Sequence, residues 1–263
     1  MNKMKSSGIY GCLIGLLILS CGPVRYDVQD EEWVTLFNSR DLTGWTPKFS
    51  GRPVGENYKN TFVVQDSVLQ VNYAEYDTFR NEFGHLFYKS PFKYYRLKME
   101  YRFTGPPTPG APAWAHRNNG VMILAQSPQS MMLDQDFPVS IEVQFLGGDG
   151  KTARPTGNLC TPGMHVYLND TLATEHCINS RSATYHGDRW VKMEVLVLPD
   201  STIHHLIEGD TVISYAKPVI GGDFLPEGYP LKEGSPVTEG YIALQAESHR
   251  TEFRNIRIQP IEQ

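Results

Sequence analysis

A strict alternation of apolar and charged residues constrains the fold of this chain most. In Tyr95–Phe103 (YRLKMEYRF) every second residue is apolar and the residues between them are charged. Successive side chains of a β-strand point to opposite faces of a sheet, so this period of two predicts a strand with one buried face. Similar patterns predict strands at 120–126, 139–146, 190–198, 201–208, 211–215, 240–247 and 251–259. No long stretch has the 3.6-residue period of an amphipathic helix, so we expect an all-β fold.

The N-terminal segment predicts export. Two lysines precede an apolar run from Gly11 to Leu19, which is too short to cross a hydrocarbon core of about 30 Å. Ile18-Leu19-Ser20-Cys21 resembles the lipobox of bacterial lipoproteins, in which the cysteine is lipidated after cleavage. The alternative is an ordinary cleaved signal with a stray cysteine. We therefore expect a lipid-anchored protein, periplasmic or at the cell surface, with a signal peptide at 1–20 and a tether at 21–31.

The charge of the chain argues against nucleic-acid binding, and its length limits the number of domains. The chain of 263 residues has a formal net charge of −5, and loss of residues 1–20 with their two lysines would change it to −7 (−5 − 2). Acidic and basic residues are mixed along the rest, without the basic stripe that nucleic-acid binding requires. The roughly 230 residues that remain fit one large β-sandwich, which we place at 32–261.

Cys160 and Cys177 are the cysteines left after the signal peptide and Cys21 are set aside. In an exported protein they favour a disulfide, which would stabilise the fold by about 3 kcal/mol. Free thiols are one alternative, and a zinc site with His165 and His176 is another. Adjacent His176 and Cys177 would point to opposite faces of a strand, and the spacing fits no compact zinc finger.

Two long segments interrupt the strand pattern. The stretch from Thr104 to Gly120 is rich in proline, and the stretch from Gly147 to Gly163 is rich in glycine. Both are predicted to be loops, and long loops on a sandwich are where binding residues usually lie. Surface insertions without a role are the alternative.

Two predicted strands carry polar side chains on one face. In the strand at 139–146, Ser140, Glu142 and Gln144 share a face, and in the strand at 240–247 Gln245 and Glu247 share a face with Tyr241 and Ala243. Carboxylates and amides can accept and donate hydrogen bonds to sugar hydroxyls. The faces therefore indicate either a groove for a polyhydroxylated ligand or a plain solvated surface.

Several segments resemble, in order, the landmarks of the 3-keto-disaccharide hydrolase family. They are WVTLFNSRDLTGW (33–45), NNGVMIL (118–124), SIEVQ (140–144), GDRWVKMEV (187–195) and GYIALQAESHRTEFRNIRI (240–258). The resemblance implies a concanavalin A-like jelly roll, a sandwich of two antiparallel sheets. It also implies an exported carbohydrate-active protein of a glycan-degrading bacterium.

The resemblance further implies cleavage by elimination. Oxidation of a sugar at C3 makes the C2 hydrogen acidic, so a base can remove it while the glycosidic oxygen leaves C1, and water then adds back. Such an enzyme needs a general base, a donor at the keto oxygen and an acid for the leaving group. The expected substrate is a 3-keto sugar or oligosaccharide supplied by a sugar 3-dehydrogenase.

Some site residues follow from the same resemblance, and the others from their place in the predicted loops and strands. Glu142 and Gln144 match the family's Glu-x-Gln strand, so Glu142 is predicted to be the general base. His165, held by the disulfide next to the groove, is predicted to be an acid, a base or the keto-oxygen donor. The predicted substrate-binding residues are Trp114, Arg117, Asn119, Gln144, Gln245, Glu247 and His249.

Two other functions compete with elimination. A carbohydrate-binding module without catalysis would share the fold. A conventional two-carboxylate glycosidase is disfavoured, because Gln144 and Gly147 stand where laminarinase-type enzymes carry acids. Glu142, His165, Glu247 and His249 are residue types that a divalent metal accepts, but no spacing motif supports one and we expect no cofactor.

Overall fold

The computed structural model describes Met1 and residues 32–262. The predicted signal peptide, the lipidation site Cys21 and the tether lie outside the described residues, so they stay predictions. Within the described part of the chain, no helix is both long enough and apolar enough to cross a membrane.

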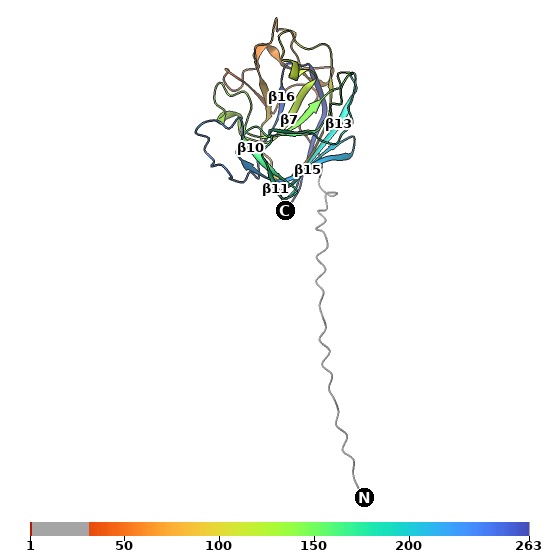
Figure 1. Ribbon diagram of the computed structural model, residues 1–263. Coiled ribbons are helices and arrows are strands. Elements are labelled where there is room, and N and C mark those ends of the chain that lie inside the picture. Colours follow the sequence, from red (N-terminus) through yellow and green to blue (C-terminus); the bar gives the residue numbers. More distant parts are fainter. Residues whose placement is uncertain (2–31, 263) are drawn as a thin grey trace. The chain divides into compact units, whose positions relative to one another are not determined.

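Two antiparallel sheets form a sandwich (Figure 1), which confirms the predicted all-β, concanavalin A-like jelly roll. Among the described residues the larger sheet has ten strands, in the order β11 (Thr171–Ala173), β10 (Met164–Leu168), β15 (Asp210–Ile220), β14 (Thr202–Ile207), β13 (Val191–Val197), β6 (Tyr95–Phe103), β17 (Thr251–Pro260), β4 (Val68–Val71) and β3 (Phe62–Gln65), with β1 (Val34–Thr35) paired to β17. The other has seven, in the order β12 (Cys177–Ile178), β9 (Asn158–Cys160), β8 (Ile141–Leu146), β7 (Asn118–Ala125), β16 (Tyr241–Ala246), β5 (Gly84–Tyr88) and β2 (Trp45–Phe49). Short 3₁₀ turns lie at η1 (Tyr58–Asn60), η2 (Ala113–Ala115) and η3 (Pro128–Ser130).

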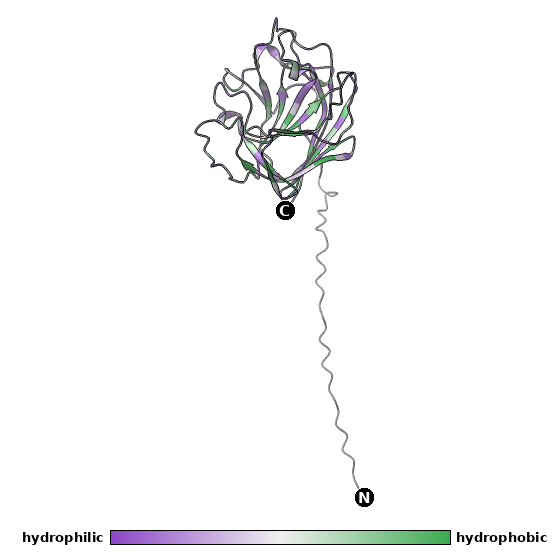
Figure 2. Cartoon of the chain, viewed as in Figure 1, coloured by the Kyte–Doolittle hydropathy of each residue, from purple (hydrophilic) through white to green (hydrophobic). Residues whose placement is uncertain are grey.

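The main core lies between the two sheets. Leu97 and Met99 of β6 are buried against the inner face of the seven-stranded sheet, where β8 contributes Ile141 and Val143 to the same cluster. Hydrophilic and hydrophobic residues mix along the strands (Figure 2), as alternating burial requires. Removal of this apolar surface from water is the main favourable contribution to folding.

The predicted loop at 147–163 is partly wrong, because it contains a strand. Asn158–Cys160 forms β9 and pairs with the edge of β8, with Glu142 opposite Cys160 and Gln144 opposite Asn158. The glycine-rich and proline-rich part before it remains a loop. The predicted Cys160–Cys177 disulfide is present in the structure and joins β9 to β12 at directly opposed residues.

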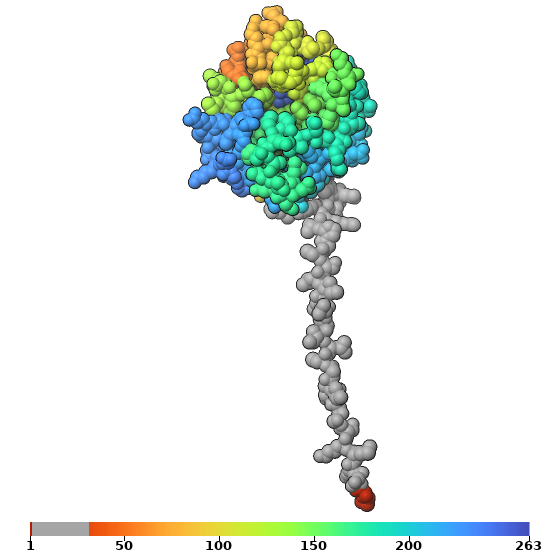
Figure 3. Space-filling view, viewed as in Figure 1, coloured from red at the N-terminus to blue at the C-terminus, as the bar shows by residue number. Residues whose placement is uncertain are grey.

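The outer face of the seven-stranded sheet is not a plain solvated surface. The segment 126–140 folds back over it, so that Met131 packs with Phe87, Met122 and Ala243 in a second, smaller apolar cluster. The segment 221–239 lies beside that loop on the surface (Figure 3), and the rings of Phe137 and Phe224 are 5.8 Å apart. These two loops cover part of the sheet and leave a hollow over the rest.

Candidate active site

A cavity of about 590 Å³ opens on the outer face of the seven-stranded sheet. Polar side chains of β7, β8 and the end of β16 form its floor, and aromatic side chains of the covering loops form its walls. The lining residues are Asn81, Phe83, Pro112, Trp114, Asn118, Asp136, Phe137, Glu142, Gln144, Cys160, Pro162, His176, Cys177, Phe224 and Glu247.

Gly120 makes room for the carboxyl group of Glu142. The two residues lie on adjacent strands, where Gly120 is opposite Gln144 and Met122 is opposite Glu142. A Cβ atom at position 120 would stand 2.7 Å from Cγ of Glu142. The Glu142 side chain therefore lies across the gap in the sheet surface that the missing side chain leaves.

Glu142 and Glu247 form a buried pair of carboxyl groups. Their exposed fractions are 6% and 4%, and Oε2 of Glu247 has no hydrogen-bond partner. Burial raises the pKa of Glu142 to about 8. Burial also raises the pKa of Glu247 well above its ordinary value, and the nearby charge of Glu142 raises it further. Because like charges in a dry site resist ionising together, the pair loses its first proton only at about pH 8 and then holds one base and one acid.

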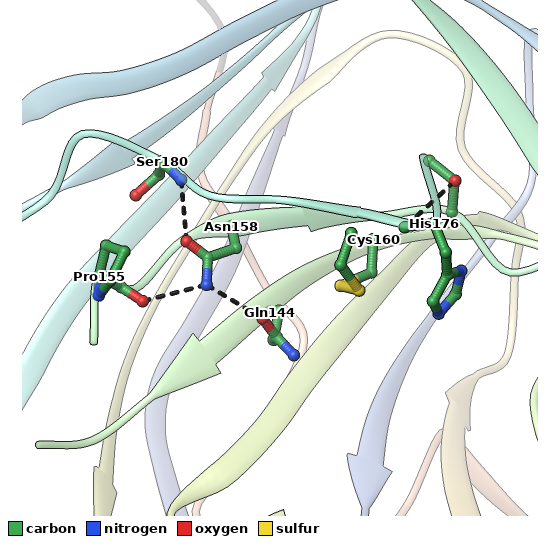
Figure 4. The surroundings of a disulfide bond; sticks show 8 residues. Gln144, Pro155, Asn158, Cys160, His176 and Ser180 are labelled. Carbon is green, nitrogen blue, oxygen red and sulfur yellow. Dashed lines mark hydrogen bonds between the residues drawn. A yellow bond between two sulfur atoms is a disulfide. The ribbon is translucent and has the colours of Figure 1, made fainter. Parts of the chain in front are cut away.

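The disulfide forms one wall, together with Gln144 and His176 (Figure 4). Nδ2 of Asn158 donates to Oε1 of Gln144 at 3.0 Å, which fixes the amide and leaves its NH₂ group free to donate. The ring of His176 contacts that of Phe224 at 4.8 Å. Burial lowers the pKa of His176, and the charge of Asp223 opposes this.

Aromatic rings run along the opposite side of the cavity. Phe83 stacks on Trp114 at 6.1 Å and contacts Phe137 at 5.1 Å, and Phe137 reaches Phe224. The terminal rings of this series, Trp114 and Phe224, are each 54% exposed at the rim. Exposed aromatic faces of this kind can stack on sugar rings.

The structure brings together part of the predicted site. Glu142, Gln144, Glu247 and Trp114 all line the cavity. Gln245, predicted to bind substrate, is instead fully buried on β16 and lies outside the residues that line the cavity.

The expectation that the disulfide brings His165 to the groove is corrected by the structure. Gly163, at a φ of +72°, turns the chain from β9 of one sheet to β10 of the other, so His165 lies on the ten-stranded sheet opposite Val219. Its ring packs on Gly222, where an added Cβ would stand 2.6 Å from Cε1. The disulfide holds His176 at the cavity instead.

Arg117 and Asn119 also point elsewhere than expected. Arg117 forms an ion pair with Asp188 at 3.0 Å and donates to the carbonyl of Gly187 at 2.7 Å. Asn119 faces the core side of β7, where its Nδ2 donates to the backbone carbonyl of Gln245 at 2.9 Å. Asn119 therefore positions the neighbouring strands, whereas Asn118 lines the cavity.

His249 lies at the end of the sandwich, outside the cavity lining. Its fully buried ring packs against Phe103 at 5.7 Å and His116 at 5.4 Å. Burial lowers the pKa of His249 to about 4, with a smaller contribution from His116. Among the described residues, no group of three or more His, Cys, Asp or Glu side chains is arranged to hold a metal ion.

Some residues of the cavity carry no signal that sequence reasoning used. Phe83, Phe137 and Phe224 lie outside the strands and loops predicted from the sequence, and only the fold shows that they meet. The sequence suggests His176 only as a zinc ligand, although this residue directly precedes Cys177 and so lies next to the disulfide.

Comparison with known proteins agrees with the fold. A family model described as a 3-keto-alpha-glucoside-1,2-lyase-like domain matches residues 32–259. A structure from Parabacteroides distasonis described as a "putative glycosyl hydrolase" is similar, with 17% identity, a TM-score of 0.53, and 88% of this chain and 94% of that chain covered. A second structure so described from the same organism has 16% identity and a TM-score of 0.52, with 88% of this chain and 100% of that chain covered. No curated protein matches the sequence.

Proposed function

We propose a sugar lyase function from a premise that the family match establishes: the chain belongs to the 3-keto-alpha-glucoside-1,2-lyase-like family. In this proposal the protein cleaves 3-keto glycosides, including disaccharides, by elimination across C1 and C2 followed by hydration. The observation that carries it is the buried pair of Glu142 and Glu247 in one cavity. Elimination needs a base and an acid on the same substrate, and two carboxyl groups that share one proton supply both.

Each carboxyl group has a role that follows from its pKa. Glu142, whose pKa is raised less than that of Glu247, is the group that ionises first and removes the C2 proton. The electrons of the C2–H bond form the C1–C2 double bond as the C1–O bond breaks. The departing glycosidic oxygen takes the proton held by Glu247. Burial makes Glu142 a stronger base than an exposed carboxylate, since its proton affinity is higher.

Hydrogen-bond donors on the cavity wall stabilise the keto oxygen of the substrate. Negative charge develops on that oxygen when the C2 proton leaves, and fixed N–H donors in a water-poor site stabilise it. The amide of Gln144 and the ring of His176 both face the cavity and provide such donors. His176 takes the donor role that the sequence assigned to His165.

The cellular setting belongs to the same proposal. The segment 1–21 supports export and lipidation of Cys21, and the disulfide fits an oxidising compartment. The protein would then be anchored to a membrane, periplasmic or at the cell surface. There it would act on 3-keto sugars produced by a sugar 3-dehydrogenase.

One rival function has an observation in its favour. The exposed rings of Trp114 and Phe224 are equally suited to a carbohydrate-binding module without catalysis. A binding module, however, gains nothing from two desolvated carboxyl groups, which are costly to bury.

The test compares a 3-keto glucoside with its unoxidised parent, using the full-length protein and mass spectrometry. We expect cleavage of the keto compound alone and a loss of about 10²-fold or more in Glu142→Gln. Glu194→Gln serves as the control, because Glu194 pairs with Arg96 on the other sheet at 2.5 Å. Cleavage of the parent sugar would overturn elimination, and binding without cleavage would favour the binding module.

A further inference from the structure

Beside the carboxyl pair lies a group of buried polar atoms without partners. His85 on β5 and Gln245 on β16 are directly opposite each other, and both side chains are fully buried. Neither ring nitrogen of His85 and neither amide atom of Gln245 has a hydrogen-bond partner, and Oε2 of Glu247 also lacks one. Since residues two apart share a face, Gln245 on β16 and Glu247, which directly follows that strand, lie on the same side of the sheet.

Buried polar groups left unpaired cost free energy, so such groups almost always have partners. The neighbouring side chains do not supply them here, because Phe87 and Phe137 are the rings that pack on His85, at 6.2 and 5.9 Å. Polar recesses of this kind hold ordered water, and each buried water makes about three hydrogen bonds. The donors and acceptors of His85, Gln245 and Glu247 match that requirement.

This recess adjoins the cavity. Phe137 contacts His85 on one side and lines the cavity on the other, and Glu247 belongs to both. Burial lowers the pKa of His85 to about 3, and the charge of Lys48 lowers it further. The ring is therefore neutral near pH 7 and presents one donor and one acceptor, which suits it to orient water and not to ionise it.

We propose that His85 and Gln245 hold the water molecule that hydrates the product of the elimination. The inference rests on the proposed function, because it assigns the source of the water for its second step. Elimination leaves a cyclic enone, with a double bond between C1 and C2 conjugated to the ketone at C3. The oxygen of the held water bonds to C1 while one of its protons passes to the ionised carboxylate of the pair. The C1–C2 π electrons move toward the ketone, and C2 then takes a proton from the protonated carboxyl group, giving the 3-keto sugar.

The experiment separates the two steps by supplying the enone itself. Full-length wild-type protein, Gln245→Leu and His85→Phe are each incubated with the 3-keto glucoside and, separately, with the chemically prepared enone. The enone and the hydrated sugar are quantified by mass spectrometry against a protein-free blank. His204→Phe, which alters a half-buried histidine of β14 bonded to Ser214, is the matched control. Melting curves check that each variant is folded.

We expect both recess variants to hydrate the enone at least tenfold more slowly than wild type, while glycoside cleavage falls less than threefold. The enone should then accumulate during glycoside cleavage. His85→Gln, which restores one donor and one acceptor, should recover part of the hydration and carries the test if His85→Phe does not fold. Hydration at the wild-type rate in folded Gln245→Leu would overturn the inference, as would equal losses of both steps. Hydration of the enone without cleavage of any glycoside would refute the proposed elimination while leaving the water site in place.

Discussion

Gly120→Ala tests the carboxyl geometry without straining the backbone. The new Cβ would stand 2.7 Å from Cγ of Glu142, whereas carbon atoms in contact prefer about 3.5 Å or more, so the side chain must move by roughly 1 Å. A displacement of that size at a reacting group can cost about 10²-fold in rate. We therefore expect kcat/KM for the 3-keto glucoside to fall by about 10²-fold.

The stability effect of Gly120→Ala should be small by comparison. An off-rotamer side chain and one added methyl group together cost about 1–2 kcal/mol, which for a domain of this size lowers the Tm by roughly 2–8 °C. The assay therefore pairs steady-state kinetics with a melting curve on the same sample.

Glu142→Ala provides the control background for this substitution. Without Cγ, Cδ and Oε1 the side chain leaves space above residue 120, so adding Gly120→Ala should change the residual rate by less than about threefold there, a strong departure from additivity. If Gly120→Ala keeps wild-type activity, or costs the same in both backgrounds, the contact with Glu142 does not govern activity and the reasoning fails.

Three further predictions follow from the site. The carboxyl group of Glu142 has its ordinary pKa of 4.5 in the unfolded chain, and burial raises that pKa to about 8 in the folded protein. The unfolded state therefore binds fewer protons between these values, so the free energy of unfolding falls as pH rises from 4.5 to 8. Glu142→Gln should flatten this slope, which melting curves at about pH 5, 6.5 and 8 would reveal. Cys177→Ser should lower the free energy of unfolding by about 3 kcal/mol, given the loop of 17 residues that the disulfide closes, and dithiothreitol should lower the wild-type Tm but not that of the variant. His176→Ala should reduce kcat at least about tenfold, because it removes a hydrogen-bond donor at the keto oxygen. His165→Ala should stay near wild type in the same assay. A larger loss in His165→Ala than in His176→Ala would contradict the site described above.

The strand faces were predictable from sequence because alternation is a local property. Ile141, Val143 and Phe145 face the core while Glu142 and Gln144 face the cavity, as the period of two required. Strand order is not local. That β16 lies between β7 and β5, and so carries Glu247 to Glu142, depends on pairings between segments far apart in the chain.

The errors at the site have a similar cause. His165 follows Cys160 by five residues and His176 directly precedes Cys177, and which of them reaches the cavity depends on Gly163, where the chain passes to the other sheet. No local pattern marks that crossing. The role of His85 could not be predicted for another reason. A single histidine in a short apolar strand (GHLFY) indicates no site until the residues that pack around it are known.

The strand order also dictates when this protein can fold. Each sheet has a C-terminal strand in its interior: β16 separates β5 from β7, and β17 separates β4 from β6. Until residues 241–260 are available, β5 cannot be joined to β7 nor β4 to β6, although β7 can already pair with β8 and β6 with β13. Contacts of such high sequence separation form slowly. Neither sheet can therefore be completed before residues 241–260 are delivered, and a protein shortened before β16 would lack an interior strand of each sheet and not merely an edge.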